Sequence, residues 1–128
     1  MARFYLRVLE KQNGAEGDGE LVVNPNEDAV SLEHIMPQTR DPHWTASVTA
    51  EQHAAFLKRL GNLALLDKTL NGQSGNLPFA DKIAAFKESK IALTSQIATH
   101  LTWTSAEIDT RQKALAELAV KAWPAAPR

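Results

Sequence analysis

The stretch that decides the fold is Ser31–Thr39, SLEHIMPQT, which carries an adjacent Glu33 and His34 at the end of a short apolar run. The run has the length and alternation of a strand, and Pro37 stops it because proline has no backbone N–H to donate. A carboxylate and an imidazole at a strand end can both reach a substrate. An acidic residue beside a histidine is more often an ordinary surface pair, so the pair needs support from elsewhere in the chain.

The sequence on either side predicts a mainly helical chain with a small β-hairpin in the middle. Residues 29–34 and 62–66 are the expected strands, and the second follows Gly61 as the continuous apolar run NLALL. The second and the last of the expected helices begin at capping boxes, a Thr followed three residues later by Gln or Glu. The expected helices cover residues 2–11, 49–59, 78–90, 91–101 and 104–123.

Composition limits what the chain can be. Its 128 residues, 44% of them hydrophobic, suit one compact domain with a core of its own. The 14 basic and 15 acidic residues give a net charge of −1, so any contact with nucleic acid must be local. The absence of cysteine excludes disulfides, thiolate zinc sites and cysteine nucleophiles. The sequence has neither a signal-peptide pattern nor an apolar run approaching the roughly 20 residues that span a bilayer, so we expect a soluble, cytoplasmic protein without membrane contact.

Support for the pair comes from residues 61–71, GNLALLDKTLN, in which Asn62 opens the second strand and Asn71 follows nine residues later. Each asparagine has an ordinary explanation, because Asn62 could begin a strand from a turn and Asn71-Gly72 is a common turn dipeptide. Together with EHIMP at residues 33–37, their order and spacing resemble the HNH, or His-Me finger, nucleases. The resemblance implies a ββα-metal core, in which a β-hairpin and a following helix surround one divalent ion.

A narrower resemblance covers nearly everything from Arg3 to Pro124. It consists of EHIxPQ, a tryptophan soon after it, LGNLxLL, N-x-PF-x-x-K, a Trp-Thr before the last helix and a terminal Trp-Pro. This pattern is similar to the HNH domain at the C-terminus of GmrSD-type, modification-dependent restriction enzymes and of related phage-defence effectors. In that family a ParB-like nucleotide-hydrolysing domain comes first, so we expect such an N-terminal domain in the full-length protein. The abrupt start of the chain in a helix agrees with a domain excised from a longer protein.

The resemblance implies a single HNH domain over residues 1–128, a ββα-metal core embedded in a mainly α domain. Within it we expect a leading helix and loop over residues 1–28, the ββα-metal core region over residues 29–90, and C-terminal helices over residues 91–128. The implied function is a metal-dependent endonuclease that nicks or cleaves foreign or modified double-stranded DNA. The alternative is a non-catalytic module, either a degenerate nuclease that only binds nucleic acid or a helical interaction domain.

The same resemblance assigns roles to single residues. His34, with an ordinary pKa of about 6.5, would take a proton from the attacking water. Glu33 and Asn71 would hold Mg²⁺ or Mn²⁺, and Glu33 stands where many relatives have Asp, which leaves direct or water-mediated coordination open. Asn62 would orient His34 or tie the hairpin loop. Three basic side chains are expected to contact DNA, although a solvated helix face is the alternative for the first: Lys82, Lys68 and Arg59.

Other residues are assigned to structure. Arg111 lies on the apolar face of its expected helix, so we expect a buried ion pair there. Trp44 is expected to anchor an irregular loop over residues 38–48, and Trp103 and Trp123 are assigned to the core. No cysteine or close carboxylate pair completes a zinc set around the remaining histidines, which are His43, His53 and His100.

Overall fold

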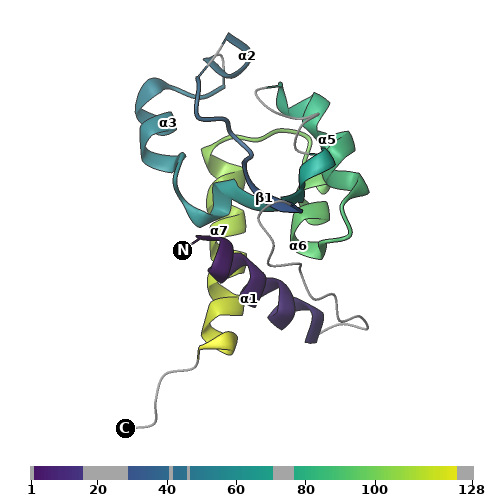
Figure 1. Ribbon diagram of the computed structural model, residues 1–128. Coiled ribbons are helices and arrows are strands. Elements are labelled where there is room, and N and C mark those ends of the chain that lie inside the picture. The colour runs from purple at the N-terminus through teal and green to yellow at the C-terminus, as the bar shows by residue number, and fades with distance from the viewer. Residues whose placement is uncertain (1, 16–28, 41, 46, 71–76, 124–128) are drawn as a thin grey trace, which may run out of the picture.

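The computed structural model describes residues 2–15, 29–40, 42–45, 47–70 and 77–123. In chain order the elements are α1 (Ala2–Ala15), β1 (Val30–His34), α2 (Pro42–Thr45), α3 (Ala50–Phe56), the 3-10 turn η1 (Leu60–Asn62), β2 (Leu63–Asp67), α5 (Phe79–Glu88), α6 (Ala92–Ser95), the 3-10 turn η2 (Gln96–Thr99) and α7 (Ser105–Ala122). The fold is mainly helical with a two-stranded antiparallel sheet in its middle (Figure 1). It agrees with the predicted fold class and is consistent with a ββα-type core.

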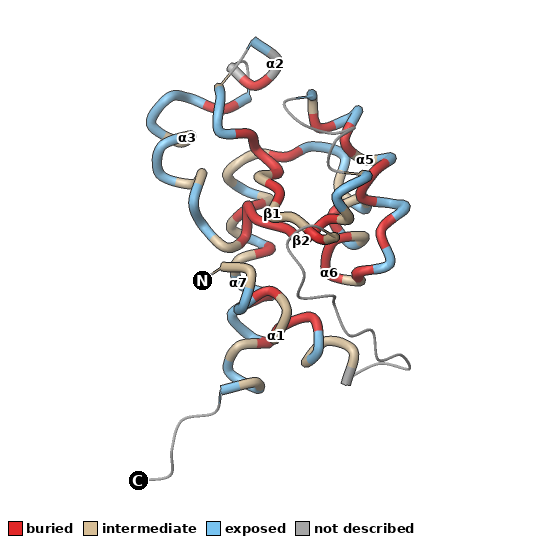
Figure 2. The backbone as a smooth tube through the Cα atoms, in the orientation of Figure 1, coloured by how far each residue is buried: buried red, intermediate tan, exposed pale blue. Residues whose placement is uncertain are grey.

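The two strands form a ribbon whose faces belong to two different cores. Glu33 pairs with Ala64, and His34 pairs with Leu63. Because side chains alternate along a strand, these two pairs point to opposite faces of the ribbon. Ala64 belongs to the cluster that contains Trp103, whereas Leu63 belongs to a second cluster on the side of α1 and α7. The buried parts of the chain accordingly converge on the two strands (Figure 2).

The helices cover this ribbon from several sides. α1 packs against α7 and also contacts β2, while α6 contacts both α1 and β2. In Figure 1, α5 and α6 lie to one side of the strands, and α2 and α3 lie beyond the end of β1. The end of β1 is therefore flanked by α3 and α5, which come from different halves of the chain.

Both predicted capping boxes are present. The Thr49 side chain accepts a hydrogen bond from the N–H of Gln52, and the Gln52 side chain accepts one from Thr49. Thr104 and Glu107 form the same arrangement at the start of α7. α3 is shorter than the expected helix over residues 49–59, because the chain leaves the helix after Phe56 and enters η1.

The other boundaries fit the expectations to different degrees. α1 extends the predicted helix, and β2 begins one residue later than predicted because Asn62 belongs to η1. The loop over residues 38–48 contains the short helix α2, in which Trp44 is only 2% exposed, as expected of an anchor. Of the leading helix and loop expected over residues 1–28, residues 1 and 16–28 lie outside the described part of the chain. None of the described helices combines the length and the hydrophobicity that crossing a bilayer would need.

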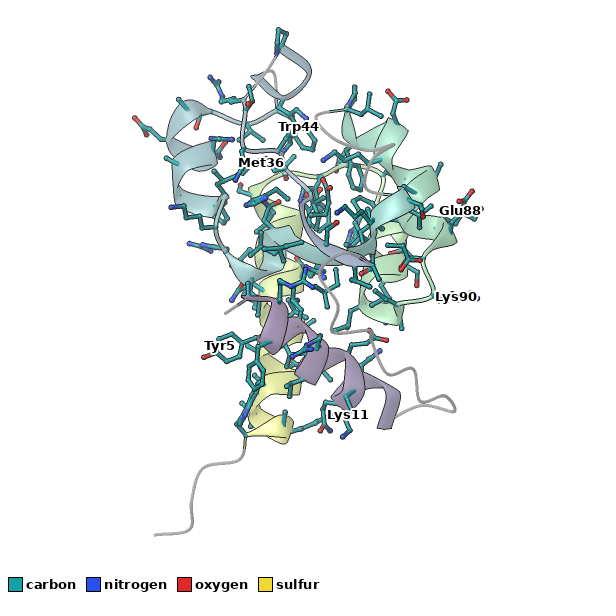
Figure 3. The ribbon with its side chains drawn as sticks, viewed as in Figure 1. Tyr5, Lys11, Met36, Trp44, Glu88 and Lys90 are labelled. Atoms are coloured by element: carbon teal, nitrogen blue, oxygen red, sulfur yellow. The ribbon has the colours of Figure 1, made fainter. Side chains whose placement is uncertain are left out.

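Two predictions are wrong, one about a helix and one about a core residue. The expected helix over residues 91–101 is divided into α6 and η2, and the extended backbone at His100 turns the chain so that Leu101 is 92% exposed. Trp123 was expected in the core but is 43% exposed, and it contacts Tyr5 edge to face where α7 ends. Figure 3 shows Tyr5 projecting outward from α1. Trp103 does lie in the core, as predicted.

Candidate functional site

The candidate site is the end of β1, where the Glu33 and His34 side chains differ sharply in exposure. Glu33 is only 4% exposed, whereas His34 is half-buried and keeps part of its surface in solvent. The ribbon continues one residue beyond the strand, because the Ile35 N–H donates to the carbonyl of Asn62 at 2.9 Å. The backbone that carries His34 is thus held by the ribbon on both sides of the histidine.

Glu33 is neutralised by a buried lysine from α5. Lys82 Nζ lies 2.9 Å from Glu33 Oε1 and donates to the carbonyl oxygens of His34 and Ile35, each at 3.0 Å. The lysine is 0% exposed, because it occupies the same helical stripe as the buried Phe79 and Phe86. The expectation that Lys82 contacts DNA is therefore corrected, since its ammonium lies beneath the strand end and faces the protein.

His34 is suited to accept a proton near neutral pH. Burial lowers the pKa of its imidazole, and the positive charge of Lys82 lowers it further. A pKa below the ordinary value of about 6.5 keeps the ring neutral at pH 7. A neutral, partly exposed imidazole can take a proton from water, which is what a general base requires.

The Asn62 side chain fixes the chain after β1 through hydrogen bonds. Its Oδ1 accepts hydrogen bonds from the N–H of Met36 at 2.8 Å and from Trp103 Nε1 at 3.1 Å. Its Nδ2 donates to the carbonyls of Met36 and Leu57, both at 3.0 Å. Asn62 is completely buried, so of its two predicted roles the geometry favours tying the hairpin loop. Its influence on His34 runs through the backbone, and its side chain is not a catalytic contact in this arrangement.

A second histidine supports the same loop. His53 Nε2, on α3, lies 2.8 Å from the carbonyl oxygen of Pro37, within hydrogen-bond distance. Arg40 also stabilises this loop, because its Nε donates a hydrogen bond to the carbonyl of Val48 at 2.8 Å. The sequence analysis assigned no site role to His53, and the 16 residues that separate it from Pro37 gave no pattern that could reveal the contact. The EHIMP segment is thus held from three directions, by α5, η1 and α3.

The turn η1 is fixed to α7 by Gly61 and Arg111. The Gly61 N–H donates to Gln112 Oε1 at 2.6 Å, and an added Cβ at Gly61 would lie 2.4 Å from the carbonyl oxygen of Ile108. Arg111 Nη1 donates to the carbonyls of Gly61 at 3.0 Å and Leu63 at 2.6 Å. Arg111 was expected to form an ion pair, but among the described residues its guanidinium donates to backbone carbonyls. Burial lowers the pKa of its guanidinium to about 10, so it remains charged at neutral pH.

The other predicted site residues are spread over the molecule. Arg59 is exposed, lies 3.9 Å from the ring centroid of Phe56 and reaches Asp109 at 3.8 Å. Lys68 is exposed just after β2, at the end of the ribbon opposite His34. Four residue steps of the ribbon correspond to about 13 Å between these ends. Asn71, the second predicted metal ligand, lies outside the described residues.

The described residues supply a sparse set of metal ligands. Among them, no three His, Asp or Glu side chains are grouped closely enough to hold an ion. Glu33 offers a hard carboxylate oxygen of the kind that Mg²⁺ and Mn²⁺ prefer, although one oxygen already contacts Lys82. Mg²⁺ commonly binds through one or two carboxylates and retains several waters, so the donor chemistry fits such an ion with few protein ligands.

A cavity of about 230 Å³ lies away from this strand end. It is bounded by α1, α6, η2 and α7, and its lining is mostly apolar. Among the predicted residues only Arg111 and His100 line it, and neither was assigned to the site. The cavity therefore contributes nothing to the chemistry at β1.

The chain was compared with known protein families. Residues 1–118 fit the family described as GmrSD restriction endonucleases, C-terminal domain. The match includes β1, η1, β2 and α5, which build the strand end and its supports. No curated protein matches the chain.

Proposed function

Because the chain belongs to the family of GmrSD restriction endonuclease C-terminal domains, we propose that it is a metal-dependent DNA endonuclease of the HNH type. The family supports a nuclease module of a restriction enzyme. The observation that carries the finer proposal is the half-buried His34, whose lowered pKa keeps it neutral at the end of a rigidly held strand. In a cell the module would nick or cleave foreign or modified DNA in phage defence.

In this proposal His34 is the general base. Its imidazole takes a proton from the water that attacks the scissile phosphorus, and the leaving group is the 3′ oxygen of the DNA. Glu33 and His34 point to opposite faces of the ribbon, so a phosphate would have to approach the end of the ribbon to lie near both side chains. The contacts around residues 33–36 hold the backbone that carries the imidazole.

Glu33 and Asn71 are the proposed ligands of Mg²⁺ or Mn²⁺. An ion held there would supply Lewis-acid stabilisation of the phosphate and of the departing oxygen. Because Lys82 already contacts Oε1 of Glu33, coordination through an intervening water is compatible with the arrangement.

Double-stranded DNA is the proposed substrate, and Arg59 and Lys68 are the proposed phosphate contacts. The net charge of −1 gives the domain little general attraction for DNA. We therefore propose that the ParB-like N-terminal domain of the full-length protein brings DNA to this site, since a tether raises the effective concentration of a weakly bound partner.

Plasmid nicking tests the proposal. Supercoiled DNA is incubated with the chain in Mg²⁺ or Mn²⁺, and in EDTA, using wild type, His34→Ala and the control Lys113→Ala. We expect wild type and the control to nick only with metal, and His34→Ala to lose nearly all activity. Equal nicking by wild type and His34→Ala would exclude the catalytic role. Absence of nicking in every metal, even with the native N-terminal region fused, would favour the non-catalytic module.

A further inference from the structure

Lys82 is a lysine in a setting where lysines are rarely found. It is 0% exposed, yet it lies on a helix whose other charged residues, among them Asp81 and Lys87, are in solvent. A buried ammonium loses its hydration, so it is tolerated only where protein oxygens replace the water. Its position beneath β1 therefore points to a specific task for the charge.

The contacts of the ammonium identify that task. Among the described residues, it donates to three successive residues, namely to the carboxylate of Glu33 and to the carbonyls of His34 and Ile35. The two carbonyls belong to the peptide units that follow His34 and Ile35, so the ammonium fixes the backbone on the C-terminal side of the histidine.

We propose that Lys82 is a positioning residue, which holds Glu33 and the His34 backbone so that the imidazole is aimed at the scissile phosphate. This inference rests on the proposed nuclease function. Lys82 touches neither DNA nor the reacting atoms, and its effect reaches the reaction through the strand end. A misplacement of about 1 Å in a catalytic group can cost 10²-fold in rate, so loosening this segment affects turnover.

Two other roles predict different results. A lysine that binds a DNA phosphate would alter the KM and the salt dependence of binding, because each phosphate contact contributes to counterion release. A lysine that only stabilises the fold would lower the free energy of unfolding without a selective effect on kcat. Positioning instead predicts a lower kcat at nearly constant KM in protein that is still folded.

The first measurement uses Lys82→Met, which keeps the length of the side chain and removes the charge. Lys90→Met, at an exposed position just beyond the same helix, is the matched control. We expect kcat for nicking to fall about 10- to 100-fold in Lys82→Met with KM within about twofold of wild type, and no change in the control. Unchanged kcat, or a higher KM with a shallower salt dependence, would overturn the proposal.

The absence of cysteine allows a rescue experiment at the same position. The Lys82→Cys variant is unfolded and treated with 2-bromoethylamine. The thiolate sulfur displaces bromide, and the product is a side chain of lysine length that ends in an ammonium. Treatment with 1-bromopropane gives a neutral side chain of the same length. As a control, wild-type protein is unfolded, treated with each of the two reagents in separate samples, and refolded. We expect the product with the ammonium to regain the kcat of wild type, and the propyl product to keep a low kcat. Equal kcat values for the two products would contradict the positioning role.

An NMR measurement separates this inference from the proposed function. In metal-free wild type we expect one sharp signal from the His34 ring, and in Lys82→Met a broadened or multiple signal, because the segment samples several positions. An unchanged ring signal together with unchanged kcat would overturn the role of Lys82. If wild type fails to nick but the ring signal changes as expected, the nuclease function fails while Lys82 still fixes the strand end.

Discussion

Glu33 and His34 are neighbours in the chain, but their environments give them different properties. Glu33 is buried against an ammonium, and His34 is partly exposed with a lowered pKa. The strand separates them by directing one side chain to each face. The electrostatics of this pair thus depend on Lys82, which is 48 residues away from His34 in sequence.

The lowered pKa of His34 leads to a prediction about pH. In the metal-free chain we expect the ring to titrate below about pH 6.5, as measured by NMR. Between the folded and unfolded pKa values the unfolded chain binds more protons, so the stability contributed by neutral His34 is present above about pH 6.5. It is lost as the pH falls through that value towards the folded pKa.

Urea unfolding of wild type and His34→Gln over the same pH range isolates this contribution, because other titrating groups cancel in the difference. The stability of wild type relative to the variant should decrease on acidification. A ring midpoint at or above about 6.5 would contradict the assigned environment of the histidine.

At the residue scale the sequence pointed to candidate residues for the chemistry but not to the side chains that support them. His34 and Glu33 stand out because their residue types suit a nuclease and because EHIMP is followed by GNLALLDKTLN. The burial of Lys82 was missed, although its spacing of three from Phe79 and four from Phe86 puts it on the apolar stripe. A lysine on such a stripe is usually assigned to the solvent side, and only the fold reveals the oxygens that accept its hydrogen bonds.

At the element scale the decisive contact is that of η1 with α7. Gly61 lies so close to α7 that a methyl group would meet a backbone carbonyl, and Arg111 of the same helix donates to the carbonyls of Gly61 and Leu63. The turn contains Asn62, whose side chain forms hydrogen bonds with the N–H and the carbonyl of Met36 just after the strand end. Positioning of the site thus depends on a helix that contributes no predicted catalytic residue.

Replacing Gly61 with alanine should therefore destabilise the chain. The added Cβ would come within 2.4 Å of the Ile108 oxygen and 3.1 Å of the Gln112 Cβ, so η1 must move away from α7. We expect a loss of about 1–3 kcal/mol in the free energy of unfolding, measured in urea. Adding Gln112→Ala should not restore it, because the closest contact is with backbone. A Gly61→Ala chain as stable as wild type would contradict this packing.

Elements with local signals were predictable from the sequence. The capping boxes at Thr49 and Thr104 and the apolar run of β2 gave elements of the right type in the right order. The division of residues 91–101 into α6 and η2 was not predictable, because helical spacing of apolar residues does not reveal where tertiary packing bends the chain. The exposure of Trp123 likewise depends on where α7 ends relative to α1.

At the scale of the whole molecule, charge limits how the domain can meet DNA. The basic and acidic residues nearly balance, so binding has to rely on a few local cations. Arg59 is the best placed of the described candidates, because it precedes η1 and lies near the His34 end of the ribbon. Lys68 is at the other end, so both could contact DNA only if the duplex followed the ribbon.

We expect Arg59→Ala to weaken DNA binding and to reduce the slope of log affinity against log salt by about one. Lys113→Ala is the control, because Lys113 and Arg59 both pair with Asp109 but Lys113 lies on the exposed face of α7. Fluorescence anisotropy over a range of salt concentrations measures both variants. Equal effects of the two substitutions would show that Arg59 acts only through general charge.

The central claim is that the end of β1 is one site, where a divalent ion and His34 act on the same phosphate. Anomalous diffraction from a crystal soaked in Mn²⁺ tests it most directly. The account predicts a single strong peak at the strand end, either about 2.1 Å from a Glu33 oxygen or one water further away, with the His34 imidazole close enough to reach a phosphate bound by the ion. A peak bound elsewhere on the chain, with Glu33 still enclosed by Lys82 and no ion near His34, would contradict it.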